Sequence, residues 1–267
     1  MDLAQPTLHH RALFLSDLHL GAMGSRADRL LEFLRGVSAD TIYLVGDVLD
    51  LWHPRRPVWG HAEEAVLSLL SDRADRGTRV VYLIGNHDAA ALADRRRLPP
   101  SFEIALECLH RAGNGRSYLV LHGDVADARI FRSHLSTRIG SWTNSGLRRL
   151  DLALSRLRRQ SRVEQRSLIE AALAGVNALM ALGSRHERRL IAMARALGQD
   201  GVICGHFHKP MLHHNHGLTY ANCGDWMDSF TSLAEDADGH LKLVRWQGAS
   251  QDARAGRDDP TLVGAAR

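Results

Sequence analysis

Residues 79–88, RVVYLIGNHD, decide how the rest of the chain is interpreted. An apolar run with the length of a buried strand ends here at Gly85, a residue that permits a sharp turn. An amide, an imidazole and a carboxylate follow directly, at Asn86, His87 and Asp88. A surface turn does not need three side chains that can coordinate a ligand. The stretch therefore raises the hypothesis of a site at the end of a strand, to be judged by whether other strands end similarly.

Further apolar runs also read as buried strands, at 12–15, 41–45, 117–121, 202–204, 218–221 and 241–246. Helical patterns separate the first of them, at 27–37 and 61–77, and a further helix is expected at 185–197. Each of the first two helices places its leucine and valine residues on one face: Leu30, Leu31 and Leu34, and then Val66, Leu67 and Leu70. This alternation predicts an α/β sandwich.

Five of the predicted strands end in the same way, in Asp, His or Asn, mostly beside a glycine. The motifs are SDLHLG with Asp17 and His19, GDVLDLW with Asp47 and Asp50, GNHD, HGD with His122 and Asp124, and GHFHKP with His206 and His208. In open α/β sheets the ligand site lies beyond the carboxyl ends of the strands, so these side chains should converge. Imidazole and carboxylate together suit Zn, Mn, Fe or Ni, and the three scattered cysteines argue against a structural zinc site.

The number of such side chains exceeds what one ion needs, and it fits two ions that share a carboxylate. Paired ions of this kind catalyse in-line displacement at phosphorus, because they stabilise the attacking and the leaving oxygens. Each motif alone has an ordinary explanation, because D-x-H is common by chance and Asp47 and Asp50 could cap a helix. All five together, in order and each after a strand, favour a dinuclear metal centre.

The motif order D-x-H, G-D-x-x-D, G-N-H-D, H-G-D, G-H-x-H resembles that of the calcineurin-like metallophosphoesterases, over residues 12–209. The resemblance implies a four-layer αββα sandwich with two divalent ions, usually manganese and sometimes iron or zinc. It implies the following roles: Asp17, His19 and His208 at one ion, Asn86, His122 and His206 at the other, Asp47 between them, and His87, oriented by Asp50, as the catalytic imidazole that protonates or stabilises the leaving group.

The motifs also resemble one branch of that superfamily, the UDP-2,3-diacylglucosamine pyrophosphohydrolases of lipid A synthesis. Those enzymes release UMP and a lipid phosphate, and a helical cap beside their metals forms an acyl-chain groove. Serine/threonine phosphatases differ, because Leu51 and Trp52 stand where they have Arg-Gly. The chain departs from the lipid A enzymes at His87, where they have arginine. The substrate could therefore be a related lipid diphosphate or phosphomonoester.

Residues 125–183 read as helices only and are predicted to form a cap inserted into a core made of 1–124 and 184–246. Fourteen arginines and six acidic residues fall between 127 and 200. They could meet a diphosphate or an anionic membrane surface, or they could simply be solvated. Arg129 and Arg132, close after His122, are expected to bind substrate together with Asn86. Trp226 is expected either to stack on a base or sugar or to close the sandwich.

The remaining expectations concern location and rival functions. No signal peptide or membrane-spanning segment is expected, and the odd cysteine number fits a reducing compartment, so we expect a cytoplasmic protein at the inner-membrane surface. The tail at 247–267 is expected to be mobile. A nuclease or cyclic-nucleotide phosphodiesterase is the rival enzyme, although nucleic acid is not favoured as a partner. A scaffold without catalysis is the non-enzyme alternative, and oligomeric state stays open.

Overall fold

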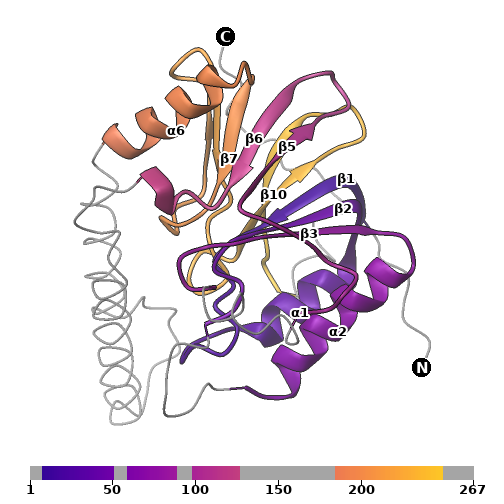
Figure 1. The fold of residues 1–267 in the computed structure, drawn as a ribbon. Coiled ribbons are helices and arrows are strands. Elements are labelled where there is room, and N and C mark those ends of the chain that lie inside the picture. Colours follow the sequence, from indigo (N-terminus) through magenta and orange to yellow (C-terminus); the bar gives the residue numbers. More distant parts are fainter. Residues whose placement is uncertain (1–7, 51–58, 89–97, 127–183, 249–267) are drawn as a thin grey trace.

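A computed structural model describes residues 8–50, 59–88, 98–126 and 184–248, and within them two β-sheets lie face to face (Figure 1). The first sheet has the strand order β11-β10-β1-β2-β3-β4. Its strands are β1 (Leu8–Leu15), β2 (Val37–Val45), β3 (Arg79–Leu83), β4 (Glu103–Ala105), β10 (Thr231–Glu235) and β11 (Leu241–Arg245). The second sheet has the order β5-β6-β7-β9-β8. Its strands are β5 (Glu107–Arg111), β6 (Ser117–Leu121), β7 (Gly201–Cys204), β8 (Met211–His213) and β9 (Thr219–Asn222).

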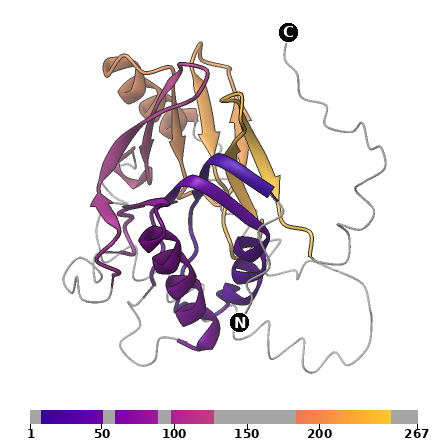
Figure 2. The same ribbon diagram turned by 90° about the vertical axis from the view of Figure 1, so that its right-hand side faces the viewer.

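Helices cover the outer face of each sheet. Helices α1 (Ala27–Gly36) and α2 (His61–Asp75) lie against the first sheet, and α6 (Ser184–Ala196) lies against the second (Figures 1 and 2). A short 3-10 helix, η2 (Asp124–Ala126), follows β6 and contacts α6. The order of layers is helix, sheet, sheet, helix, which confirms the predicted αββα sandwich.

Both faces of the central strands are apolar because each sheet is covered on both sides. Along β1, Leu13 and Leu15 pack toward α1 and α2, whereas Phe14 packs between the sheets, where its ring stacks on Tyr43 at 4.7 Å. In the second sheet, Val120 faces the first sheet and Leu119 faces α6. Three apolar clusters result, one in each gap between layers, and they hold the strand ends in fixed positions.

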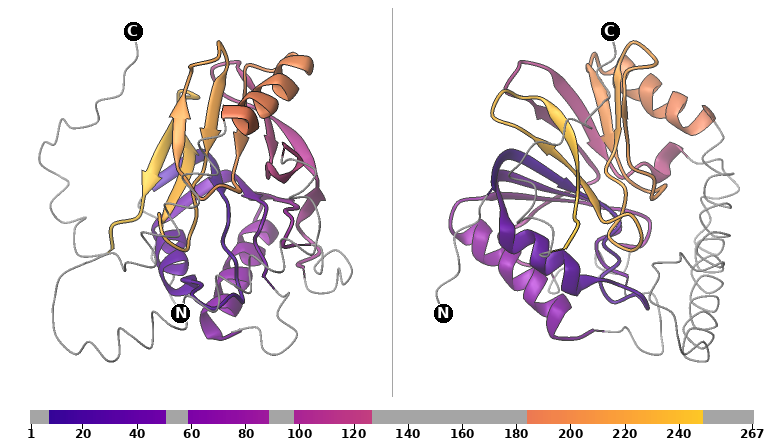
Figure 3. Two further views of the ribbon diagram at one scale, coloured as in Figure 1. Left: turned by 90° about the vertical axis from the view of Figure 1, so that its left-hand side faces the viewer. Right: turned by 180° about the vertical axis from the view of Figure 1, so that it is seen from behind.

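The parallel strands bring the five motifs to one end of the sandwich. Strands β1, β2, β3 and β4 run parallel to one another, as do β6, β7 and β9. The segments that follow these strands, which contain residues 17, 47, 86, 122 and 206, therefore lie at a common edge. Figure 3 shows the sandwich in two further views. The remaining pairings are antiparallel: β1 with β10, β10 with β11, β5 with β6, and β8 with β9.

The seven predicted strands are all present, with ends that differ by a few residues, and the helices expected near residues 27, 61 and 185 are confirmed. Strands β4, β5, β8 and β10 were not predicted. The cap helices predicted at 128–139, 147–159 and 163–182 lie outside the described residues, as does the tail from residue 249. Among the residues that the structure describes, no helix is both long and apolar enough to cross a bilayer.

Candidate metal centre

The loops after β1, β2 and β7 have an unusual backbone. Six residues other than glycine have positive φ in the described part of the chain, and five of them are expected metal ligands: Asp17, His19, Asp47, His206 and His208. This conformation is unfavourable for residues with a Cβ and persists only where surrounding structure imposes it. Backbone hydrogen bonds hold the first two loops together, from Asp17 N–H to Gly46 O at 3.1 Å and from His19 N–H to Asp47 O at 2.9 Å.

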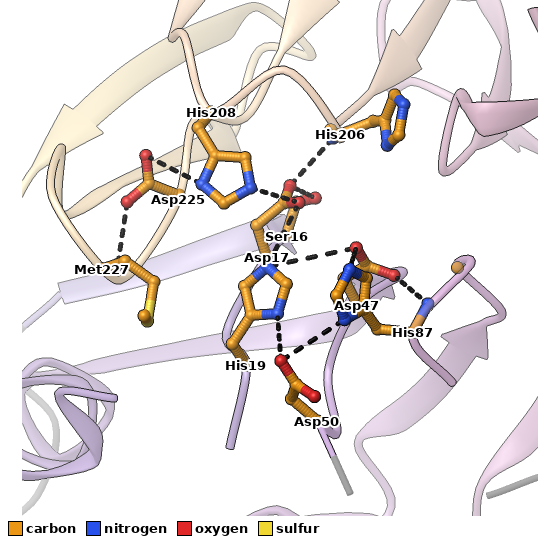
Figure 4. Close-up of polar contacts among 12 residues, drawn as sticks. Ser16, Asp17, His19, Asp47, Asp50, His87, His206, His208, Asp225 and Met227 are labelled. Carbon is orange, nitrogen blue, oxygen red and sulfur yellow. Dashed lines mark hydrogen bonds and ion pairs between the residues drawn. The ribbon is translucent and has the colours of Figure 1, made fainter. Parts of the chain in front are cut away.

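One group of ligand-type side chains consists of Asp17, His19 and His208 (Figure 4). Asp17 Oδ1 lies 3.3 Å from His208 Nε2 and 3.9 Å from His19 Nε2. Asp17 Oδ1 and His19 Nε2 are both buried, and neither has a hydrogen-bond partner among the described residues. Buried polar atoms without partners are costly, so their convergence indicates a place for a cation.

A second group consists of Asp47, His122 and His206, with Asn86 beside them. His122 Nε2 lies 3.3 Å from Asp47 Oδ2 and 3.2 Å from Asn86 Oδ1, and the rings of His122 and His206 are 5.0 Å apart. The same oxygen of Asp47 lies 4.0 Å from His19 Nε2 in the first group. Asp47 therefore faces both groups, as a carboxylate shared by two ions would.

The electrostatic field of the centre favours positive charge. Burial lowers the pKa of His19, but the hydrogen bond that its ring donates to Asp50 and the charges of Asp47, Asp50 and Asp17 outweigh burial and raise that pKa to about 9. The pKa of His122 is raised well above its usual value, because the Asp47 carboxylate more than offsets the effect of burial. A site that attracts protons onto two buried imidazoles also attracts divalent cations, which compete for the same nitrogens.

Asp50 contacts two imidazoles. Its Oδ2 lies 3.3 Å from His87 Nδ1 and 3.5 Å from His19 Nδ1 (Figure 4). The backbone N–H of His87 donates to Asp47 Oδ1 at 2.8 Å, which leaves Asp47 Oδ2 directed at the two groups. The His87 ring stands at the side of the centre, with Nε2 3.9 Å from Asp47 Oδ2. Asp50 thus lies beside both His87 and His19, and its expected role in orienting His87 stays a prediction.

Asp88, the last residue of GNHD, does not face the centre. It is fully buried and accepts hydrogen bonds from the Tyr82 hydroxyl and from the backbone N–H groups of Asp47, Val48, Leu49 and Gly85. Burial and the nearby Asp47 carboxylate raise the pKa of Asp88 to about 6, and these hydrogen bonds act in the opposite direction. The hypothesis of three coordinating side chains in a row is thus wrong for Asp88. This residue instead joins the loop after β2 to the loop after β3.

The glycines of the motifs allow a close approach of backbone to ligand side chains. A Cβ at Gly85 would lie 2.5 Å from Asp47 N and 2.9 Å from His122 Cδ2, and one at Gly205 would lie 2.6 Å from Asp17 Oδ2. Gly46 has φ of +75° in addition, and its Cβ would lie 2.6 Å from His122 Cβ. Only glycine fits at these three positions without displacing the expected ligands.

Gly205→Ala is therefore expected to destabilise the fold by about 1–3 kcal/mol through overpacking. It should also weaken divalent-metal binding, because the new methyl group pushes against Asp17 and the Ser16 side chain. Urea unfolding and isothermal titration with Mn²⁺ measure the two effects. Gly36→Ala is the matched control, since nothing lies within 4 Å of its Cβ position. Equal behaviour of the two variants would contradict the steric account.

Trp226, one of the expected substrate-binding residues, lies in the core. It is 1% exposed and packs on Phe33 between the first sheet and its helices, with the ring centroids 4.9 Å apart. A side chain so covered cannot stack on a ligand, so the structure favours its alternative role of closing the sandwich. Arg129 and Arg132 lie outside the described residues. Their contact with substrate stays a prediction.

Asp225, which precedes Trp226, is a residue of the centre that the sequence interpretation missed. It is fully buried, and its Oδ2 lies 3.6 Å from His208 Nδ1 (Figure 4). The sequence does contain a signal, because a Gly-Asp pair, Gly224 and Asp225, comes one residue after the end of β9, and a similar pair, Gly46 and Asp47, comes directly after β2.

The donor set fits divalent metal ions: it consists of imidazoles, carboxylates and one amide, it is largely buried, and it contains polar atoms without partners. Such a set, at the carboxyl edge of an αββα sandwich, defines the class of metal-dependent phosphoesterases. The model of the calcineurin-like phosphoesterase family matches residues 10–210. The chain therefore belongs to the calcineurin-like phosphoesterase family and is a metal-dependent hydrolase.

Named relatives cover most of the chain. The UDP-2,3-diacylglucosamine hydrolase of Neisseria meningitidis serogroup B is 28% identical over 245 residues, which are 85% of this chain and 95% of that protein. The UDP-2,3-diacylglucosamine hydrolase of Ralstonia nicotianae is 30% identical over 227 residues, or 80% and 82% of the two chains. Among solved structures, the E. coli phosphoesterase Yfce aligns with a TM-score of 0.45 and 16% identity, over 88% of this chain and 99% of that one.

Proposed function

We propose that the protein holds two divalent metal ions and hydrolyses the diphosphate of a lipid-linked nucleotide, of which UDP-2,3-diacylglucosamine is the first candidate. The observation that carries the proposal is the position of Asp47 Oδ2, within 4.0 Å of His19 Nε2 and 3.3 Å of His122 Nε2. One carboxylate oxygen thus joins two groups of ligands.

The first ion would be held by Asp17, His19 and His208, and the second by Asn86, His122 and His206, with Asp47 shared. Manganese is the expected metal, with iron or zinc as alternatives. Ions bound here would lower the pKa of water and neutralise charge on the phosphoryl oxygens. The donors of this set are held by backbone and buried hydrogen bonds, so little reorganisation is needed during the reaction.

The residues of the chain then divide the remaining work. In this proposal His87 donates a proton to the leaving group, and Asp50, whose Oδ2 lies 3.3 Å from His87 Nδ1, holds the ring in position. In the reaction a water oxygen forms a bond to phosphorus, the bridging P–O bond of the diphosphate breaks, and UMP and a lipid phosphate leave. Arg129 and Arg132 are proposed to bind the diphosphate.

The choice of substrate rests on two supports. The relatives from Neisseria and Ralstonia are named as UDP-2,3-diacylglucosamine hydrolases. The arginine-rich segment at 125–183, proposed as a helical cap, could bind a diphosphate and rest on an anionic membrane surface. A cytoplasmic enzyme at the inner membrane follows from such a substrate. A phosphomonoesterase acting on a lipid phosphate is the second candidate, favoured by His87 in place of arginine.

A comparison of substrates tests the proposal. The purified protein with Mn²⁺ is expected to convert UDP-2,3-diacylglucosamine to UMP and lipid phosphate faster than it hydrolyses the lipid phosphate, a cyclic nucleotide or single-stranded DNA. Treatment with EDTA should stop turnover, and added Mn²⁺ should restore it, because the proposed reaction depends on the bound metal ions. Preference for a nucleic-acid substrate, with binding that weakens steeply with salt, would instead support the nuclease.

A further inference from the structure

The loop that joins β9 to β10 carries a second carboxylate aimed at the metal centre. Asp225 is the fourth residue of the stretch NCGD, and both it and Asn222 are fully buried. Figure 4 shows Asp225 on the side of His208 that faces away from Asp17. The His208 ring thus lies between two carboxylates, with Nε2 3.3 Å from Asp17 Oδ1 and Nδ1 3.6 Å from Asp225 Oδ2.

The two oxygens of Asp225 have different surroundings. Oδ1 accepts backbone N–H groups from Met227 at 2.8 Å, Asp228 at 2.5 Å and Ser229 at 3.2 Å, which shapes the loop. Oδ2 is buried and makes no hydrogen bond within the described residues. The loop needs only one acceptor oxygen, which an asparagine would supply equally well. The second oxygen is therefore explained by His208 and not by the loop.

The loop is built to hold Asp225 in place. Asp225 N–H donates to Ser229 Oγ at 2.9 Å, and Ser229 Oγ donates back to Asp225 O at 3.1 Å. Thr231 Oγ1 donates to Cys223 O at 2.9 Å, and Gly224, with φ of +77°, leaves space for these hydroxyls. Trp226 N–H donates to Asp17 O at 3.2 Å, so the loop is also attached to the first metal loop.

Other imidazoles of the centre have the same orientation, with Nε2 toward the other ligands and Nδ1 toward an acceptor. His122 Nδ1 faces Val45 O at 3.0 Å, His19 Nδ1 faces Asp50 at 3.5 Å, and in each ring Nε2 faces the other ligands. An acceptor behind Nδ1 keeps the proton on that nitrogen and leaves the Nε2 lone pair for a metal. At His208 that acceptor is a charged carboxylate, which also makes the imidazole a stronger donor.

We propose that Asp225 is a positioning residue of the metal centre: its Oδ2 fixes the tautomer and orientation of His208 and so sets the affinity of the site formed by Asp17, His19 and His208. The inference rests on the proposed function, since it requires that His208 bind a metal. It assigns to the β9–β10 loop a part in metal retention that neither the five sequence motifs nor the family match includes.

Asp225→Asn is the decisive variant. The amide oxygen can still accept the three backbone N–H groups, whereas the NH₂ group would face His208 Nδ1 and favour a proton on Nε2, which blocks coordination. In isothermal titration with Mn²⁺ we expect the Kd of one ion to rise about 10- to 100-fold, while the Kd of the other ion changes little. Circular dichroism and urea unfolding should show an intact fold.

Ser229→Ala is the matched loop control, because it removes hydrogen bonds of the loop and leaves Asp225 Oδ2 facing His208. It should bind both ions like the wild type. If Ser229→Ala and Asp225→Asn weaken metal binding equally, Asp225 acts only by shaping the loop, and the inference is wrong. In Zn²⁺-loaded wild-type protein, ¹⁵N-edited NMR should show His208 with its proton on Nδ1, assigned by its loss in His208→Gln.

The outcomes separate the inference from the proposed function. A wild-type protein that binds two ions and turns over substrate, with an Asp225→Asn variant of unchanged metal affinity, would overturn the inference and leave the function intact. A wild-type protein that binds no divalent metal would overturn both. Loss of one ion in Asp225→Asn supports the inference whichever phosphate ester proves to be the substrate.

Discussion

Asp47→Asn is expected to reduce kcat/KM for bis-p-nitrophenyl phosphate by about 10³-fold or more at saturating Mn²⁺. The fold should persist, because an amide oxygen can still accept the His87 N–H that Asp47 Oδ1 accepts at 2.8 Å. What changes is the atom that faces His19 and His122, which becomes an NH₂ group in place of a charged oxygen. A metal contributes several kcal/mol to stabilisation of the transition state, and about 4 kcal/mol corresponds to this factor.

Steady-state kinetics over a range of Mn²⁺ concentrations give the required measurement. Asp40→Asn makes the same chemical change at an exposed position near the middle of β2, away from the strand end that leads to Asp47, and it should stay within about twofold of the wild type. Binding stoichiometry adds a second readout, because loss of the shared carboxylate should lower the number of ions bound per chain. Near wild-type turnover by Asp47→Asn would show that the two groups of ligands do not act as one centre.

Much of the candidate centre can be predicted from sequence because its signals are local. A strand that ends in glycine and then a ligand-type residue is visible in five short motifs, and parallel strands place such ends at one edge. The structure brings six of the seven expected ligands into two groups, and within each group the ligand atoms lie within 4.8 Å of one another. The positions of the side chains do not by themselves establish that ions are bound or that two ions share Asp47. Both statements belong to the proposed function.

Prediction from sequence fails at residues of the centre whose role is set by neighbours that only the folded chain brings into contact. Asp88 has the same chemistry as Asp47, yet it accepts four backbone N–H groups in the interior, and nothing in GNHD distinguishes the two uses. Trp226 is polar at one atom and aromatic elsewhere, so its residue type suits a ligand site or a core equally. Asp225 depends on the position of His208, which is 17 residues earlier in the chain.

The strands that the sequence does not predict also depend on contacts made only in the folded chain. Strands β4 and β8 have three residues each, too few for a periodic pattern, and they form because a neighbouring strand offers its edge. Strand β10, TSLAE, is buried along its whole length, including Glu235, although a charged residue is unusual in a core strand. That carboxylate accepts hydrogen bonds from His110, Arg11 and the Gly113 N–H, partners that only the folded chain brings together.

His87→Ala should separate acid catalysis from metal chemistry. The ring stands beside the centre, with Nδ1 3.3 Å from Asp50 and Nε2 3.9 Å from Asp47, where a leaving group could accept its proton. Loss of a general acid costs about 10²–10⁴-fold when the leaving group is a poor one such as an alkoxide. It should cost less than about 10-fold when the leaving group is p-nitrophenolate, which departs without a proton.

A series of aryl and alkyl phosphodiesters, measured for kcat/KM with and without the His87→Ala change, tests this role. The variant should show a steeper dependence of log kcat/KM on leaving-group pKa, and its affinity for Mn²⁺ should stay close to that of the wild type. His240→Ala, which removes an exposed imidazole in the turn before β11, is the control and should leave the whole series unchanged. Equal losses across the series would mean that His87 binds the phosphoryl group or positions Asp47 through its backbone, because neither of those roles depends on how readily the leaving group departs.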